Sequence, residues 1–141
     1  MTQHLDTSLL AAALTNEAET ERMQAWLGAQ AAGSLIISEW VATEFSAALS
    51  IKLRTGQIEE VHRADALAMF AQMRADSFTP LPISAVEFRT AAHFADQYGL
   101  GLRAGDALHL AVCANNGATL CTLDRRLSEA GPALGVKTTL L

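Results

Sequence analysis

Short apolar runs alternate with longer helix-patterned segments along this chain, and that alternation constrains the fold more than any other feature. The run SLIIS (34–38) is apolar and β-branched, as buried strands are. Segment 39–55 then repeats apolar residues such as Val41 and Phe45 at the spacing of one helical face. Strands that alternate with helices form a parallel sheet covered on both faces. The sequence therefore predicts a three-layer α/β/α fold with a short parallel central sheet.

The same patterns predict the remaining elements. Strands are expected around Leu5, at 79–84 as an edge strand that contains two prolines, at 118–123 and at 136–141. Helices are expected at 9–14 with Thr7 or Ser8 as the cap, at 17–30, at 39–55 capped by Ser38, at 58–75, at 85–98 between Ser84 and Gly99, at 103–116 and at 124–131. No linker, repeat or low-complexity tract interrupts the pattern, so we expect one domain over residues 1–141.

Composition narrows the class of protein. Half of the 141 residues are hydrophobic, which is enough to bury the core of one domain. No apolar stretch is long enough to span a bilayer and the first residues lack a signal-peptide pattern, so we expect a cytoplasmic protein with no membrane partner. The net charge of −5 argues against broad electrostatic capture of nucleic acid. It still allows phosphate chemistry at a site where carboxylates hold a cation.

Four acidic residues stand next to apolar segments. Asp6 and Asp124 each follow a predicted strand, at the end where open α/β sheets form their crevices. Glu44 lies in the middle of a predicted helix, and Asp106 lies in the first turn of another. Each aspartate alone is explained by helix capping, and Glu44 alone by a solvated or boundary position paired with a nearby base.

Taken together, the four carboxylates suggest a metal centre. Mg²⁺ and Mn²⁺ prefer oxygen ligands, and a bound cation of this kind activates water against a phosphodiester. Arg103, Arg125 and Arg126 flank the second pair of acids and could meet phosphate, although solvated charges at helix ends explain them equally well. Spacing alone leaves both explanations open, a metal site or four unrelated structural acids.

The chain resembles the PIN-domain ribonucleases, and among them the VapC-type toxins of bacterial toxin–antitoxin pairs. The segments that carry the resemblance cover essentially the whole chain in order: HLDTSLLAAAL, ISEWVATEFSAAL, LRAGDALHLAVCANNGATLCTLDRRL and LGVKTTLL. Gln3 and His4 depart from the more apolar first strand that is usual there, which leaves the length of that strand open.

The resemblance implies a site and an activity. By position, the family's acidic centre falls on Asp6, Glu44, Asp106 and Asp124, as metal ligands and catalytic groups for Mg²⁺ or Mn²⁺. Residues that would contact substrate are Thr7, Ser8, Arg103, Thr122 and Arg125. The implied protein is an endoribonuclease that cleaves RNA as the toxin of such a pair, is held inactive by a small antitoxin and forms a homodimer.

Other interpretations of the sequence remain. His109 and Cys113 have a spacing that suits zinc, but no second pair of soft ligands accompanies them, and His4 is expected at a strand edge. A catalytically silent PIN-like module that acts through protein contacts is one rival function. A metal-dependent hydrolase of DNA or of another phosphate ester is the other, because recognition of the 2′-hydroxyl cannot be inferred from these residues.

Overall fold

A parallel sheet forms the centre of the molecule. The structure is a computed structural model that describes residues 2–141. Five strands lie in the order β3-β2-β1-β4-β5, and every neighbouring pair is parallel. Their bounds are β1 (Gln3–Leu5), β2 (Leu35–Ser38), β3 (Thr79–Leu81), β4 (Thr119–Thr122) and β5 (Thr138–Leu140). The proline-containing strand β3 lies at one edge, as predicted.

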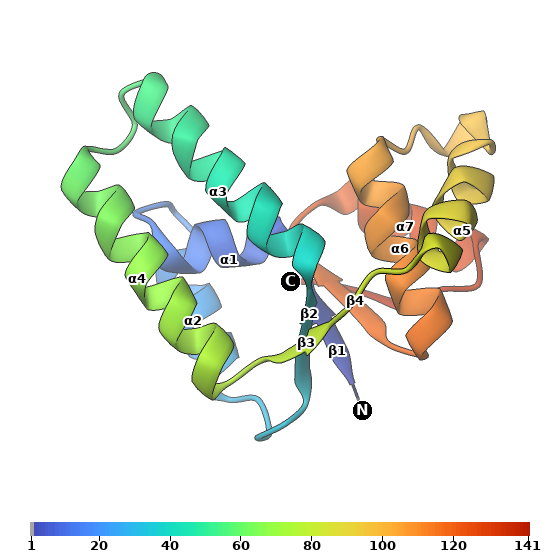
Figure 1. Cartoon of the computed structure of the whole chain (residues 1–141), viewed down its shortest axis with the longest axis horizontal. Coiled ribbons are helices and arrows are strands. Elements are labelled where there is room, and N and C mark those ends of the chain that lie inside the picture. Colours follow the sequence, from blue (N-terminus) through green and yellow to red (C-terminus); the bar gives the residue numbers. More distant parts are fainter. Residues whose placement is uncertain (1) are drawn as a thin grey trace.

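Helices connect the strands, and Figure 1 shows their arrangement. Their bounds are α1 (Thr7–Leu14), α2 (Thr20–Gly28), α3 (Glu39–Arg54), α4 (Glu60–Asp76), α5 (Ala85–Ala95), the 3₁₀ turn η1 (Tyr98–Leu100), α6 (Ala104–Asn116) and α7 (Arg125–Ala133). Among the described residues, no helix combines the length and the apolar character needed to cross a membrane.

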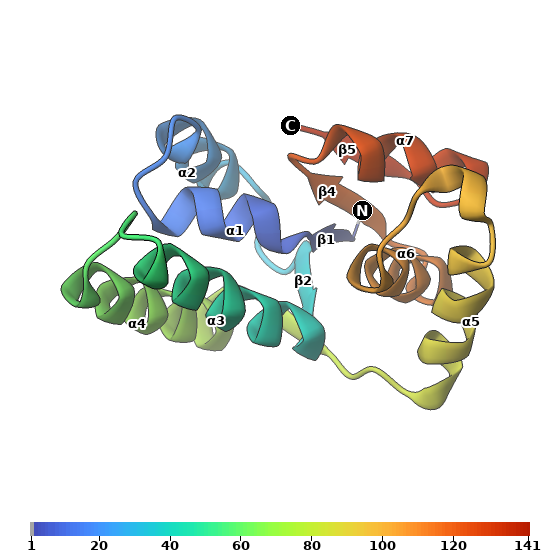
Figure 2. The same cartoon turned by 90° about the horizontal axis from the view of Figure 1, so that it is seen from above.

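Side chains of a strand alternate between the two faces of the sheet. Apolar side chains therefore point to both faces, and helices cover each face. Leu35 and Ile37 of β2 pack into a core with α1, α3 and α4, whereas Ile36 packs with Leu110 of α6 and Leu127 of α7. Figure 2 shows α1 to α4 on one side and α5 to α7 on the other. The predicted three-layer fold is confirmed.

Strand order places β1 and β4 side by side in the middle of the sheet, so their carboxyl ends are adjacent. The chain runs outward from β1 through β2 to β3, then returns to pair β4 with the other side of β1. The backbone N–H of Asp6 donates to the carbonyl of Cys121 at 3.0 Å and joins the two strand ends. Open α/β sheets bind ligands where the strand order reverses in this way.

Several predicted helix boundaries were wrong. Asp6, not Thr7 or Ser8, occupies the N-cap position of α1, because both hydroxyls bond to carboxylates instead. Gly99 does not end α5, which stops at Ala95. Gly101, with φ of +64°, takes the left-handed conformation after the 3₁₀ turn.

Two further predictions, the strand-edge position of His4 and the cap Ser38, need correction, whereas the cap Ser84 is confirmed. His4 lies in the central strand β1 with no exposed surface, not at a strand edge. Ser38 occupies the N-cap position of α3, but its side chain makes no capping hydrogen bond within the described chain. Ser84 caps α5 as predicted, since its hydroxyl accepts from the N–H of Val86.

Candidate metal centre at the carboxyl edge of the sheet

Two hydroxyl groups hold the carboxylate of Asp6. This residue follows β1, is 7% exposed, and accepts hydrogen bonds at Oδ2 from Ser8 Oγ and Thr122 Oγ1, both at 2.7 Å. Thr122 ends β4 and is completely buried. The two donors fix one oxygen of Asp6, whereas Oδ1 has His109 Nε2 as its neighbour at 3.4 Å. Sequence spacing could not show this use of the hydroxyls, because Thr122 lies 116 residues from Asp6.

Asp124 is joined to the same group through Thr122. Its backbone N–H donates to Thr122 Oγ1 at 2.9 Å, and its Oδ1 accepts from the N–H of Leu127 at 3.2 Å. The second bond caps α7, so the capping explanation of Asp124 is correct. Asp124 is exposed and its other oxygen accepts no hydrogen bond from the described residues, which leaves that oxygen for a ligand.

Glu44 reaches the centre from the middle of α3. Its Oε1 accepts hydrogen bonds from Thr7 Oγ1 at 2.8 Å and from His109 Nε2 at 2.5 Å. His109 Nε2 also lies 3.4 Å from Asp6 Oδ1. Glu44 is thus a partly exposed boundary residue paired with a basic side chain, as one explanation from the sequence expected, and α6 and the start of α1 hold its carboxylate in place.

Our sequence prediction missed the role of His109. The imidazole is 1% exposed and stands between two of the predicted acids. One signal in the sequence could have found it. His109 follows Asp106 by three residues, so the two share a helical face in an otherwise apolar segment. Its spacing to Cys113 has no part in the site, because Cys113 is buried in the core beside β4.

Neighbouring charges shift the pKa values of Glu44 and His109 in opposite directions. Burial alone would raise the pKa of Glu44, but the hydrogen bond and charge of His109 and the bond from Thr7 lower it below its usual value. Burial alone would lower the pKa of His109, but the bond to Glu44 and the charges of Asp6 and Glu44 raise it. Each group therefore favours the charged form of the other.

Asp106 lies in the first turn of α6. Its Oδ2 accepts from the backbone N–H of Arg103 at 3.3 Å, which satisfies a free donor at the start of the helix. Burial raises the pKa of Asp106, and so do the negative charges of Asp124 and Asp6, while the bond from Arg103 acts the other way. Asp106 is thus a helix-capping residue and also a member of the acidic group.

The donor set fits a hard divalent cation. Asp6, Glu44 and His109 each bring a potential ligand atom within 4.8 Å of the others. Asp106 and Asp124 are linked to this group through the charge effects and hydrogen bonds described above. Asp6, Asp106 and Asp124 each use one oxygen for hydrogen bonds to the protein and keep a second one, and hard cations prefer such oxygens.

A polar cavity opens beside these acids. Its volume is about 350 Å³ and its lining residues are Arg103, Asp106, Asp124 and Arg126. Both arginines are exposed, and neither forms an ion pair with a carboxylate of the described chain. Arg125, which the sequence also suggested, is not part of the lining. The cavity therefore offers positive and negative groups side by side to a ligand.

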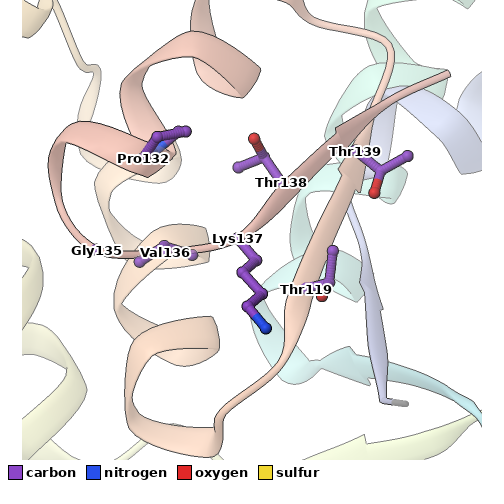
Figure 3. Close-up of a pocket in the computed structure, with 7 residues that line it drawn as sticks. All are labelled: Thr119, Pro132, Gly135, Val136, Lys137, Thr138 and Thr139. Carbon is purple, nitrogen blue, oxygen red and sulfur yellow. The ribbon is translucent and has the colours of Figure 1, made fainter.

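A larger cavity of about 500 Å³ lies at the opposite end of β4 and β5 and is shown in Figure 3. Its lining residues include no carboxylate. They are Thr119, Pro132, Gly135, Val136, Lys137, Thr138 and Thr139. The acidic group therefore lies at the carboxyl ends of the strands and not in this larger cavity.

Gly105 leaves room for two side chains of α3 at the start of α6. A Cβ atom at this position would lie 2.8 Å from Glu44 Oε2 and 3.2 Å from Trp40 Nε1. Real Cβ atoms essentially never approach an oxygen so closely. Gly105 therefore allows Glu44 to reach the centre, and the sequence analysis did not single out this residue.

Comparison with known proteins places the chain in a structural context. The family profile of the PIN domain matches residues 4–131. No curated protein matches the chain in sequence.

Three solved structures share its fold. FitAcB from Neisseria gonorrhoeae has a TM-score of 0.70 and 18% identity over 97% of this chain and 96% of that one. VapC20 of Mycobacterium tuberculosis, described as a sarcin-ricin loop cleaving toxin, has a TM-score of 0.74 and 18% identity over 92% and 95%. VapBC2 of Rickettsia felis, bound to a DNA fragment from its promoter, has a TM-score of 0.67 and 16% identity over 99% and 98%.

Proposed function

Because the chain belongs to the PIN-domain family, we propose that it is a metal-dependent endoribonuclease and the toxin of a toxin–antitoxin pair. One observation carries the proposal. Four carboxylates from β1, α3, α6 and the end of β4 gather at the carboxyl edge of the sheet, next to a cavity with two arginines. Carboxylates beside arginines suit a cation together with a phosphodiester.

Asp6, Glu44, Asp106 and Asp124 would hold Mg²⁺ or Mn²⁺. Such an ion, when bound, supplies a more acidic water and neutralises negative charge on the phosphate. The protein's own part is to fix the carboxylates before substrate arrives. Thr7, Ser8 and Thr122 do this in the structure, since each donates its hydroxyl to a carboxylate oxygen. Contact of these three hydroxyls with substrate stays a prediction.

Arg103 and Arg126 would bind the phosphate groups on either side of the cleaved bond. Both line the cavity with Asp106 and Asp124, and a guanidinium binds phosphate oxygens through two parallel hydrogen bonds. Arg125 remains a candidate for contact with more distant phosphates. The net charge of −5 limits binding elsewhere on the surface, so the arginines and the bound ion would provide most of the attraction for RNA.

The choice of RNA and the partner come from the related structures. One of them is described as a toxin that cleaves the sarcin-ricin loop, and another is described as a toxin–antitoxin complex from Klebsiella pneumoniae. We propose that a small antitoxin covers the acidic edge of this chain and places a basic side chain near the carboxylates, where it would weaken metal binding. We also propose that the protein forms a homodimer and acts in the cytoplasm.

Cleavage assays with antitoxin-free protein test the function. We expect RNA cleavage with Mg²⁺ or Mn²⁺ and none with EDTA. Asp6→Asn should lower the rate by more than about 100-fold, since a lost ligand costs more than a lost residue that orients one. Asp65→Asn is the matched control, because Asp65 is exposed on α4 and lies outside the acidic group. Cleavage at full rate in EDTA would contradict the proposal, and preferential cleavage of DNA would assign a different substrate.

A further inference from the structure

His109 lies between the carboxylates of Asp6 and Glu44 and brings one ring nitrogen close to both. It comes from the second turn of α6, is 1% exposed, and meets Glu44 across 65 residues of sequence. A histidine that stands between two carboxylates can act in two ways. It can bind the metal through a bare nitrogen, or it can donate a hydrogen bond to a carboxylate.

The contacts at Nε2 favour the donor role. Nε2 lies 2.5 Å from Glu44 Oε1 and 3.4 Å from Asp6 Oδ1, and both of these atoms are acceptors. An Nε2 without a proton would place its lone pair against the lone pairs of Oε1. The proton is therefore on Nε2, both in the neutral ring and in the doubly protonated one.

The contacts at Nδ1 exclude the arrangement that metal binding requires. A histidine that binds a metal through Nε2 carries its proton on Nδ1, where a carbonyl or carboxylate almost always accepts it. Nδ1 of His109 is buried and has no hydrogen-bond partner among residues 2–141. Metal binding through Nε2 would thus lose the bond to Glu44 and bury an unpaired N–H group.

We propose that His109 is a positioning residue that orients Glu44 through its Nε2–H group and is not itself a ligand of the metal. Thr7 Oγ1 donates to the same oxygen, so two donors hold Oε1 from two elements. Oε2 then lies beside Gly105, and the indole nitrogen of Trp40 lies close to the same glycine. The inference rests on the proposed metal centre and specifies how the protein builds it.

Mn²⁺ binding to the whole chain tests this role without an activity assay. His109→Leu removes the N–H donor, and we expect Mn²⁺ affinity in calorimetry to fall about 10- to 100-fold, as it does when a residue that orients a ligand is lost. His109→Gln keeps an N–H donor the same number of bonds from Cβ, so its affinity should stay close to that of the wild type. Equal loss in both variants, or loss in neither, overturns the proposal.

Pulsed EPR of wild-type protein loaded with Mn²⁺ provides a test that needs no variant. We expect no coupling of the size produced by a directly bonded imidazole nitrogen. Such a coupling would make His109 a ligand and overturn the inference, even if His109→Leu does not fold. Failure of the proposed function looks different, because the wild type would then bind no Mn²⁺ at all.

Discussion

Asp106 shows how one residue can serve both structure and chemistry. Its carboxylate closes the first turn of α6 by accepting from Arg103 N–H, and it also lies within the electrostatic reach of Asp6 and Asp124. A cap needs an oxygen acceptor and not a charge, so asparagine preserves the cap and removes the repulsion. The two roles can therefore be separated by experiment.

We expect Asp106→Asn to stabilise the metal-free protein at pH 7. A raised pKa means that the folded state binds the proton more tightly, so the stability from Asp106 is present below its unfolded pKa and is lost as pH rises through its folded pKa. The gain should be at most about 1 kcal/mol, since the half-exposed carboxylate is screened by solvent. Thermal melts in EDTA measure it, and the gain should vanish at a pH below the unfolded pKa.

Mg²⁺ should reverse this order. A ligand at a hundredfold excess over its Kd stabilises the folded state by about 2.7 kcal/mol, and the variant lacks one of the proposed ligands. The same melts repeated with Mg²⁺ check the reversal. An Asp106→Asn protein that is less stable than the wild type in EDTA at pH 7 would show that the cap outweighs the repulsion.

At the scale of elements, the centre depends on side chains of α3 that reach the start of α6. Glu44 comes from α3 and His109 from α6, and Gly105 leaves the space in which Glu44 Oε2 lies. Gly105 is in the first turn of α6 and has ordinary helical geometry, so its conformation alone does not require glycine. Its role is to leave room for the Glu44 carboxylate and the Trp40 indole.

Gly105→Ala should therefore separate stability from activity. Alanine favours a helix by about 1 kcal/mol over glycine, but its Cβ would displace the carboxylate of Glu44. We expect Mn²⁺ affinity and RNA cleavage to fall about 10-fold or more, with a change in unfolding free energy of about 1 kcal/mol or less. Gly28→Ala is the control, because a Cβ at Gly28 in α2 meets no atom within 4 Å. Unchanged metal affinity in Gly105→Ala would contradict this role.

At the scale of the whole molecule, the sheet joins two hydrophobic cores. Cys121 of β4 belongs to the core beside α1, α3 and α4, and Cys113 of α6 belongs to the core on the other face. Both thiols are buried and form no disulfide. Burial raises the pKa of Cys121 to about 11 and raises that of Cys113 further. Each thiol therefore reports on the integrity of its own core.

The two thiols should become reactive together if the molecule unfolds as one cooperative unit. At pH 8, both should resist a disulfide reagent in the native state, because only the thiolate reacts. Cys113→Ala and Cys121→Ala each leave one thiol to follow during urea titration. We expect each thiol to become reactive at the unfolding midpoint of its own variant. Reaction of one thiol well before that midpoint would show that the two faces of the sheet unfold separately.

The sequence by itself determined the kind of each element and the positions of the acids along the chain. Apolar periodicity in SLIIS and in the helix that contains Phe45 is a local property, and the parallel sheet with its proline-containing edge strand followed from it. Asp6 and Asp124 were placed at strand ends for the same reason, since strand and helix patterns meet at those residues. Boundaries such as the end of α5 were less well predicted, because several residues near Gly99 can end a helix.

Only the tertiary structure decided which side chains meet. The strand order brings β1 beside β4, so Thr122 reaches Asp6, and the packing of helices on the sheet lets the side chains of His109 and Glu44 meet. Thr7 and Ser8 have the chemistry of helix caps, yet their hydroxyls bond to carboxylates from other parts of the chain or from the preceding turn. The physical reason is that a hydrogen bond depends on direction and on distances of about 3 Å, which spacing along the sequence does not determine for residues on different elements.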